Sequence, residues 1–115
     1  MTKLNEFIEY LNREVNNKSL YAWGGQGEAA TPEAIKRREN EENNRERVMR
    51  LYEQRISRGY GEMRLFDCSG LATYYLYNLK KLIPSDTTAN GLKGKCAALT
   101  RNELKKGDWV FRVYQ

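Results

Sequence analysis

A short run, Phe66-Asp67-Cys68-Ser69-Gly70-Leu71, constrains this chain more than any other stretch. It separates a charge-dense segment from residues that are apolar and aromatic at helical spacing, which predicts that Cys68 lies in the first turn of a helix. Free backbone N–H groups and the positive end of the helix dipole would stabilise a thiolate there, the nucleophilic form of cysteine. The alternative is a small buried cysteine beside a capping Asp67 or Ser69. Gly70 would allow the helix to lie close against a neighbouring element.

The length of 115 residues predicts one domain with a single core. A charged fraction of 30% predicts that one segment of this domain is heavily solvated. No apolar run is long enough to span a bilayer, and the first residues lack the apolar core of a signal peptide.

The net charge of +5 permits attraction to nucleic acid, an anionic wall polymer or a membrane surface. Charges of both signs alternate, however, and the acids of the basic segment argue against specific nucleic-acid binding: Glu39, Glu41, Glu42, Glu46 and Glu53. Two cysteines, Cys68 and Cys96, without any histidine imply neither a metal site nor a cofactor. Cys96 is expected to be structural or incidental.

Several segments are predicted to be helical from apolar spacing and capping residues. The first, from Thr2 to about Asn16, would bury one face: Leu4, Phe7, Ile8, Leu11 and Val15. The charged segment at about 31–60 should form two helical pieces with a soft region near 40–44, of which the first starts at Thr31-Pro32. The cysteine helix should run from Cys68 to Lys80 and bury four residues: Leu71, Tyr75, Leu76 and Leu79. A further short helix is expected between Asp86 and Leu92.

Two other stretches are not helical. Three glycines in Tyr21-Ala22-Trp23-Gly24-Gly25-Gln26-Gly27 predict a loop in which the backbone turns or closely approaches another group. Its aromatic residues would either anchor the loop to the core or line a groove, with the Tyr21 hydroxyl as a hydrogen-bond donor. Trp109-Val110-Phe111-Arg112-Val113-Tyr114 has the one convincing strand composition.

Taken in order, three stretches resemble the NlpC-type cell-wall cysteine peptidases, which are papain-like hydrolases of peptidoglycan stem peptides. These stretches are Tyr21-Ala22-Trp23-Gly24-Gly25, Phe66-Asp67-Cys68-Ser69-Gly70-Leu71 and Leu104-Lys105-Lys106-Gly107-Asp108-Trp109-Val110-Phe111. The charged insertion and the segment Asp86-Thr87-Thr88-Ala89 resemble members carried by phages and mobile elements of Gram-positive bacteria. The resemblance implies an α+β, papain-like fold, of which residues 1–115 would be the mostly helical N-terminal half with the first strand of the central antiparallel sheet.

The resemblance also implies roles for individual residues. Cys68 matches the nucleophile, which would cut the stem peptide after D-glutamate through a thioester. Tyr21 matches a tyrosine that lines the site, and Asp67 and Ser69 match positions that bind the amino end or backbone of the stem peptide. The activity would lie outside the cytoplasm at the bacterial cell wall, by an export route that these residues do not reveal.

The chain departs from the family in having no histidine, whereas the family's general base is a histidine on the strand that follows the one predicted at 109–114. Either these residues are part of a longer domain, or a short protein has lost catalysis and kept a scaffold or binding role. Both explanations predict an exposed sheet edge, and hence an oligomer or a swapped dimer. The alternative function is a non-catalytic binding or assembly module for a wall polymer or a partner subunit, in which the segment from Pro32 to Arg58 makes the contact.

Overall fold

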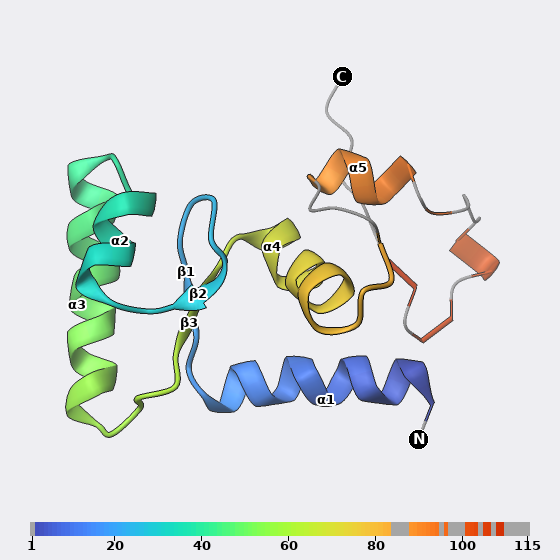
Figure 1. Cartoon of the computed structure of the whole chain (residues 1–115), viewed down its shortest axis with the longest axis horizontal. Coiled ribbons are helices and arrows are strands. Elements are labelled where there is room, and N and C mark those ends of the chain that lie inside the picture. The colour runs from blue at the N-terminus through green and yellow to red at the C-terminus, as the bar shows by residue number, and fades with distance from the viewer. Residues whose placement is uncertain are drawn as a thin grey trace.

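The computed structural model describes residues 2–83, 88–94, 96, 101–103, 105–106 and 108–109. It is of mixed α and β type, as predicted, with a small sheet between two groups of helices (Figure 1). Its elements in chain order are α1 (Lys3–Asn16), β1 (Leu20–Tyr21), β2 (Gln26–Ala29), α2 (Pro32–Arg38), α3 (Glu42–Ser57), β3 (Arg64–Phe66), α4 (Cys68–Thr73), the π-helix η1 (Tyr74–Leu79), α5 (Ala89–Gly94) and the 3₁₀ helix η2 (Arg101–Glu103).

The three strands of the described residues form one sheet in the order β1-β3-β2, so β3 is the central one. β1 runs parallel to β3 and aligns Tyr21 with Phe66, whereas β2 runs antiparallel to β3 and aligns Gln26 with the same Phe66. The expectation that only 109–114 is a convincing strand is therefore wrong, because three strands form elsewhere, whereas a strand at 110–114 lies outside the described residues. Strands this short show no alternation of apolar and polar residues, and only their pairing with distant residues defines them.

The loop between β1 and β2 carries the chain from one edge of the sheet to the other across the end of β3. The Ala22 N–H donates to the Phe66 carbonyl at 3.0 Å, and the Asp67 N–H donates to the Gly25 carbonyl at 2.9 Å. A Cβ at Gly25 would lie 2.8 Å from the Leu65 carbonyl carbon, so only glycine fits there. The predicted glycine loop with a close backbone approach is confirmed.

One hydrophobic core lies between the sheet and the helices α2 and α3. Its buried members come from both sides: Leu20, Ala22, Ala34, Ile35, Val48, Met63 and Leu65. The two helical pieces predicted for the charged segment are confirmed, because α2 begins after a capping Thr31 and α3 begins after a capping Glu41. Gly59, with φ +92°, ends the second helix.

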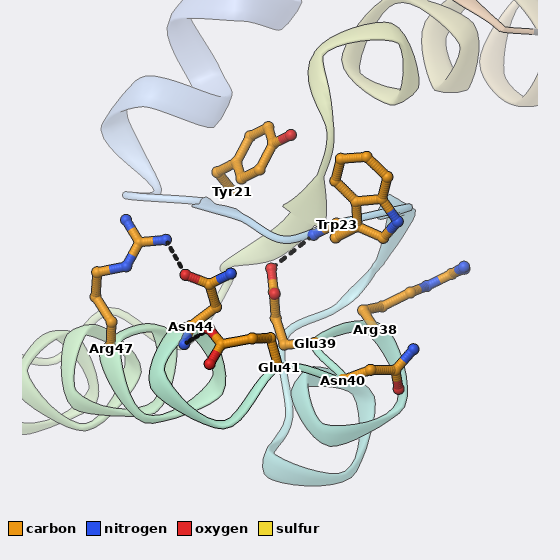
Figure 2. Close-up of a pocket in the computed structure, with 8 residues that line it drawn as sticks. All are labelled: Tyr21, Trp23, Arg38, Glu39, Asn40, Glu41, Asn44 and Arg47. Carbon is orange, nitrogen blue, oxygen red and sulfur yellow. Dashed lines mark hydrogen bonds between the residues drawn. The ribbon is translucent and has the colours of Figure 1, made fainter.

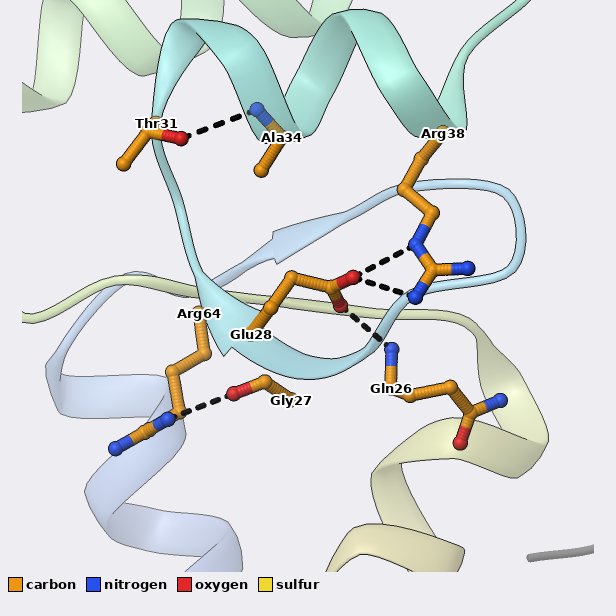
Figure 3. A network of polar contacts seen from close by, with 7 residues as sticks. All are labelled: Gln26, Gly27, Glu28, Thr31, Ala34, Arg38 and Arg64. Carbon is orange, nitrogen blue, oxygen red and sulfur yellow. Dashed lines mark hydrogen bonds and ion pairs between the residues drawn. The ribbon is translucent and has the colours of Figure 1, made fainter.

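A polar network fastens β2 to the neighbouring α2 and β3 (Figure 3). The Glu28 carboxylate accepts a hydrogen bond from the Gln26 N–H at 2.7 Å and pairs with the Arg38 guanidinium at 2.6 Å. On β3, Arg64 donates to the Gly27 carbonyl at 2.7 Å. The network holds the start of the charged segment against the glycine loop.

Aromatic rings fill the other side of the sheet, between α1 and the helix that begins at Cys68. Five of them contact one another: Phe7, Tyr10, Phe66, Tyr74 and Tyr75. Tyr10 is buried, and its hydroxyl donates to the Leu71 carbonyl at 2.6 Å. The predicted helix α1 is confirmed, but its buried face is rotated toward Tyr10 and Glu14, and the prediction that Val15 is buried is wrong.

The predicted helix from Cys68 to Lys80 forms in two parts. After Thr73 the α-helix widens into η1, where the Lys80 N–H donates to the Tyr75 carbonyl, five residues back. Tyr75 is buried as expected and Leu71 and Leu76 are half-buried, but Leu79 is exposed. The wider turn changes the angle between successive side chains, so the face predicted from α-helical spacing does not extend to Leu79.

The segments after η1 test the sequence predictions only in part. α5 covers the later part of the predicted short helix and buries Leu92, whereas Asp86 and Thr87 lie outside the described residues. Residues 110–114 of the predicted strand also lie outside the described residues. The ring of Trp109 packs against that of Phe7, with 6.1 Å between the ring centroids. Within the described ranges, no helix has the length and apolar character needed to cross a membrane.

Candidate functional site

Cys68 is the first residue of α4, directly after the central strand. β3 ends at Phe66, and Asp67 caps the helix by accepting a hydrogen bond from the Gly70 N–H at 2.5 Å. The Cys68 side chain is a free thiol and is exposed, so the alternative of a buried structural cysteine is wrong. The N–H groups of Cys68 and Ser69 have no hydrogen-bond partner in the described part of the chain.

Gly70 brings the helix into direct contact with the glycine loop. A Cβ at this position would collide with the Gly25 carbonyl oxygen and would stand 2.6 Å from Asp67 Oδ1. The predicted close packing at Gly70 is thus confirmed, and the neighbouring element is the loop between β1 and β2. This contact sets the position of Cys68 relative to that loop.

Tyr21 is brought to the cysteine by the sheet, because its parallel partner on β3 is Phe66, two residues before Cys68. Its side chain is 56% exposed. Partial burial, and then the neighbouring ionisable groups of Cys68, Asp67 and Glu39, raise the pKa of Tyr21. The pairing in the sheet is what brings Tyr21 close to the start of α4.

Ser69 completes the group of residues singled out from the sequence. Its hydroxyl donates to Asp67 Oδ1 at 3.3 Å, and its carbonyl accepts a hydrogen bond from the Thr73 hydroxyl one turn later. The structure therefore places Tyr21, Asp67 and Ser69 around Cys68. The roles expected for them in substrate binding stay predictions.

Beside these residues lies a cleft of about 280 Å³, which we call the junction cleft because α2 and α3 meet at its floor (Figure 2). The residues that line it are Tyr21, Trp23, Arg38, Glu39, Asn40, Glu41, Asn44 and Arg47. Tyr21 and Trp23 line this groove and are exposed, so their alternative role as anchors in the core is wrong. The cleft residues that come from the charged segment were predicted only to form a solvated face. Nothing local in the sequence marks Glu39 as buried.

The remaining cysteine follows α5. Cys96 is also a free, exposed thiol, and it donates to the Leu92 carbonyl at the end of α5 at 3.3 Å. Among the residues that the structure describes, no cluster of acids or cysteines could hold a metal ion.

The site can be compared with known proteins. No protein-family model, no curated protein and no solved structure matches this chain.

Proposed function

We propose that this chain supplies the nucleophile of an NlpC-type cysteine peptidase, of papain-like fold, that cuts peptidoglycan stem peptides at the bacterial cell wall. The observation that carries the proposal is the exposed Cys68 thiol at the start of a helix, with Tyr21 and Asp67 beside it. This placement offers an accessible sulfur atom and free amide donors in one place.

In the proposed reaction, the Cys68 sulfur attacks the carbonyl carbon of the bond after D-glutamate. The N–H groups of Cys68 and Ser69 stabilise the oxyanion, the C–N bond breaks, and the leaving amine takes the thiol proton. Water then hydrolyses the thioester and restores the thiol. The Oδ2 atom of Asp67 has no hydrogen bond within the described residues and is available to the amino end of the substrate.

The proton transfers need a base, and the 115 residues contain no histidine. In this proposal the base comes from outside this sequence, as a histidine of another segment or of a partner. That requirement makes a direct test possible, because a small base in solution can replace the missing group.

The test measures fragment release from purified peptidoglycan with and without added imidazole. We expect imidazole to raise release by the unaltered chain and by Cys96→Ala, and to leave Cys68→Ala inactive. Iodoacetamide should alkylate Cys68 about tenfold faster than Cys96, which is a matched exposed thiol of the same chain. Fragment release that survives Cys68→Ala would refute the assignment.

A second candidate function is a non-catalytic module that binds an anionic wall polymer. The observation that favours it is the exposed face of α3, where Arg47 and Arg50 fall on one side at helical spacing, with the exposed Arg58 directly after the helix. Binding to a polyanion that weakens steeply with salt and survives Cys68→Ala would support this function.

A further inference from the structure

Trp23 and Tyr21 present their side chains to solvent at the mouth of the junction cleft. Trp23 is 71% exposed and Tyr21 is 56% exposed, although large aromatic side chains usually bury most of their surface. Neither ring has an aromatic partner within the described part of the chain. The rings therefore offer apolar faces to a ligand in the cleft.

The loop that carries Trp23 is held in place by a buried acid. The Trp23 N–H donates to Glu39 Oε1 at 2.7 Å, as Figure 2 shows, which joins the loop to the end of α2. The cleft therefore has a defined wall rather than a free loop tip.

Glu39 is only 4% exposed, yet within the described residues its carboxylate pairs with no cation and accepts no hydrogen bond besides the one from Trp23. A buried carboxylate can accept about four hydrogen bonds and is costly when they are missing. No fully buried polar side-chain atom of the described residues lacks a partner, so the second oxygen of Glu39 is not fully buried, and Glu39 lines the cleft. It is an acceptor that a ligand can satisfy.

The charges around the cleft cancel. Two of its side chains are acidic, Glu39 and Glu41, and two are basic, Arg38 and Arg47. Arg38 already pairs with Glu28 at 2.6 Å, and Glu41 accepts hydrogen bonds from the first turn of α3. The groups left for a ligand are the second oxygen of the Glu39 carboxylate, the Asn40 amide, and the donors of Arg47 and Asn44 beyond the 3.4 Å hydrogen bond from Arg47 Nη2 to Asn44 Oδ1.

This combination fits a neutral ligand with many hydroxyl groups and one apolar face. Hydroxyl groups both donate and accept hydrogen bonds. They can therefore donate to the carboxylate, accept from the guanidinium and do either with the amides. The Glu39 carboxylate would repel a polyanion, and the Arg47 guanidinium would repel a polycation. The volume of about 280 Å³ is just below that of most ligand pockets, ~300 to 1,000 Å³, and suits one ring rather than a chain.

We propose that the junction cleft binds a sugar ring, with the ring face against Trp23 and its hydroxyl groups on Glu39 and Arg47. Tyr21 lines this cleft and pairs in the sheet with Phe66, two residues before Cys68, so the sugar would sit near the nucleophile. That the sugar belongs to the glycan of peptidoglycan rests on the proposed function. The sugar site itself does not depend on Cys68 chemistry.

The test is an NMR titration of the full chain, in a Cys68→Ala background, with a short oligomer of N-acetylglucosamine. We expect a Kd on the order of 1 mM and shifts at Trp23, Glu39 and Asn44. Trp23→Ala should weaken binding about tenfold or more. Glu39→Gln should weaken it as well, although its amide oxygen still accepts the Trp23 N–H and preserves the loop. Trp109→Phe, outside the cleft, should bind normally.

Three results would overturn the sugar site: no binding, shifts away from the cleft, or equal affinity in Trp23→Ala and the background protein. Titrations with lysine and with polyphosphate distinguish other ligand classes, and binding of either without the sugar would also overturn it. Every sample lacks Cys68, so these results do not depend on whether Cys68 is a nucleophile. Sugar binding in these samples therefore neither supports nor contradicts the peptidase proposal.

Discussion

At Gly70 the helix that carries Cys68 meets the Gly25 carbonyl oxygen, and the space for a side chain is filled by backbone atoms. Alanine is normally the better helix former by about 1 kcal/mol. Here the added methyl group must push the helix off the glycine loop, so we expect Gly70→Ala to lower the free energy of unfolding by about 1 to 3 kcal/mol. The midpoint of urea unfolding measures the loss.

Gly61→Ala is the matched control for Gly70→Ala. A Cβ at Gly61 meets nothing within 4 Å and its φ is not positive, so its effect should stay within about 0.5 kcal/mol. Equal midpoints for the two variants would contradict the packing seen at Gly70.

Tyr10 has a buried hydroxyl whose titration should be visible in the stability of the protein. Burial, and then the nearby Glu14 and Tyr74, raise the pKa of Tyr10 above its ordinary value of 10.0. Above about pH 10 the unfolded chain therefore loses this proton while the folded chain keeps it, so stability falls as pH rises.

Tyr10→Phe should remove part of that alkaline loss, and should cost about 1 kcal/mol at neutral pH through the lost bond to Leu71. Thermal unfolding followed from pH 8 to 11, on either side of the ordinary value, checks both effects. Tyr52→Phe, in the hydrophobic core on the opposite side of the sheet, keeps the Tyr10 hydroxyl and should keep the alkaline slope. An unchanged slope in Tyr10→Phe would refute the assignment.

Between elements, the ion pair of Glu28 and Arg38 joins β2 to α2 and should make this junction sensitive to acid. Burial alone would raise the pKa of Glu28, but the Gln26 N–H and the Arg38 guanidinium outweigh it and lower the pKa below 4.5. A lowered carboxyl pKa stabilises the fold above the ordinary value, and this stabilisation is lost as pH falls through the folded pKa.

Glu28→Gln should therefore be less stable at neutral pH, by about 1 kcal/mol for a partly exposed pair, and should lose less stability in acid. Circular dichroism during acid titration measures both. Glu62→Gln is the control, because Glu62 is exposed and makes no ion pair with any described residue. If the unaltered chain and Glu28→Gln lose stability in acid to the same extent, the ion pair of Glu28 and Arg38 does not make the fold sensitive to acid.

For the whole molecule, the sheet leaves one edge of β1 and one edge of β2 unpaired within the described residues. Unpaired strand edges favour pairing with another chain, so we expect a dimer or a swapped dimer whose population rises with concentration. Sedimentation velocity measures it. Ala29→Lys places a charge on the exposed edge of β2 and should shift the equilibrium to the monomer.

Leu82→Lys tests a competing interface, since Leu82 is an exposed apolar side chain just after η1. If this variant dissociates the dimer and Ala29→Lys does not, the apolar surface rather than the sheet edge makes the contact. A monomer at every concentration would contradict both.

Part of this architecture was predictable from the sequence because it depends on residues close together in the chain. Thr2 and Thr31 begin α1 and α2, Gly59 follows the end of α3, and Asp67 begins the helix that carries Cys68. Capping and helical spacing act within one or two turns, so local sequence is enough to locate them. The same local reasoning placed Cys68, Asp67 and Ser69 together.

The sequence by itself determined the helices, the glycine loop and the position of Cys68 at a helix start. Only the tertiary structure decided the pairing of Leu20 with Leu65, the rotation of α1 and the burial of Glu39 beside Trp23. These features join residues far apart in the chain or depend on the shape of a neighbouring surface. Short strands and a buried carboxylate are stable only when those distant partners are in place, and no local pattern records them.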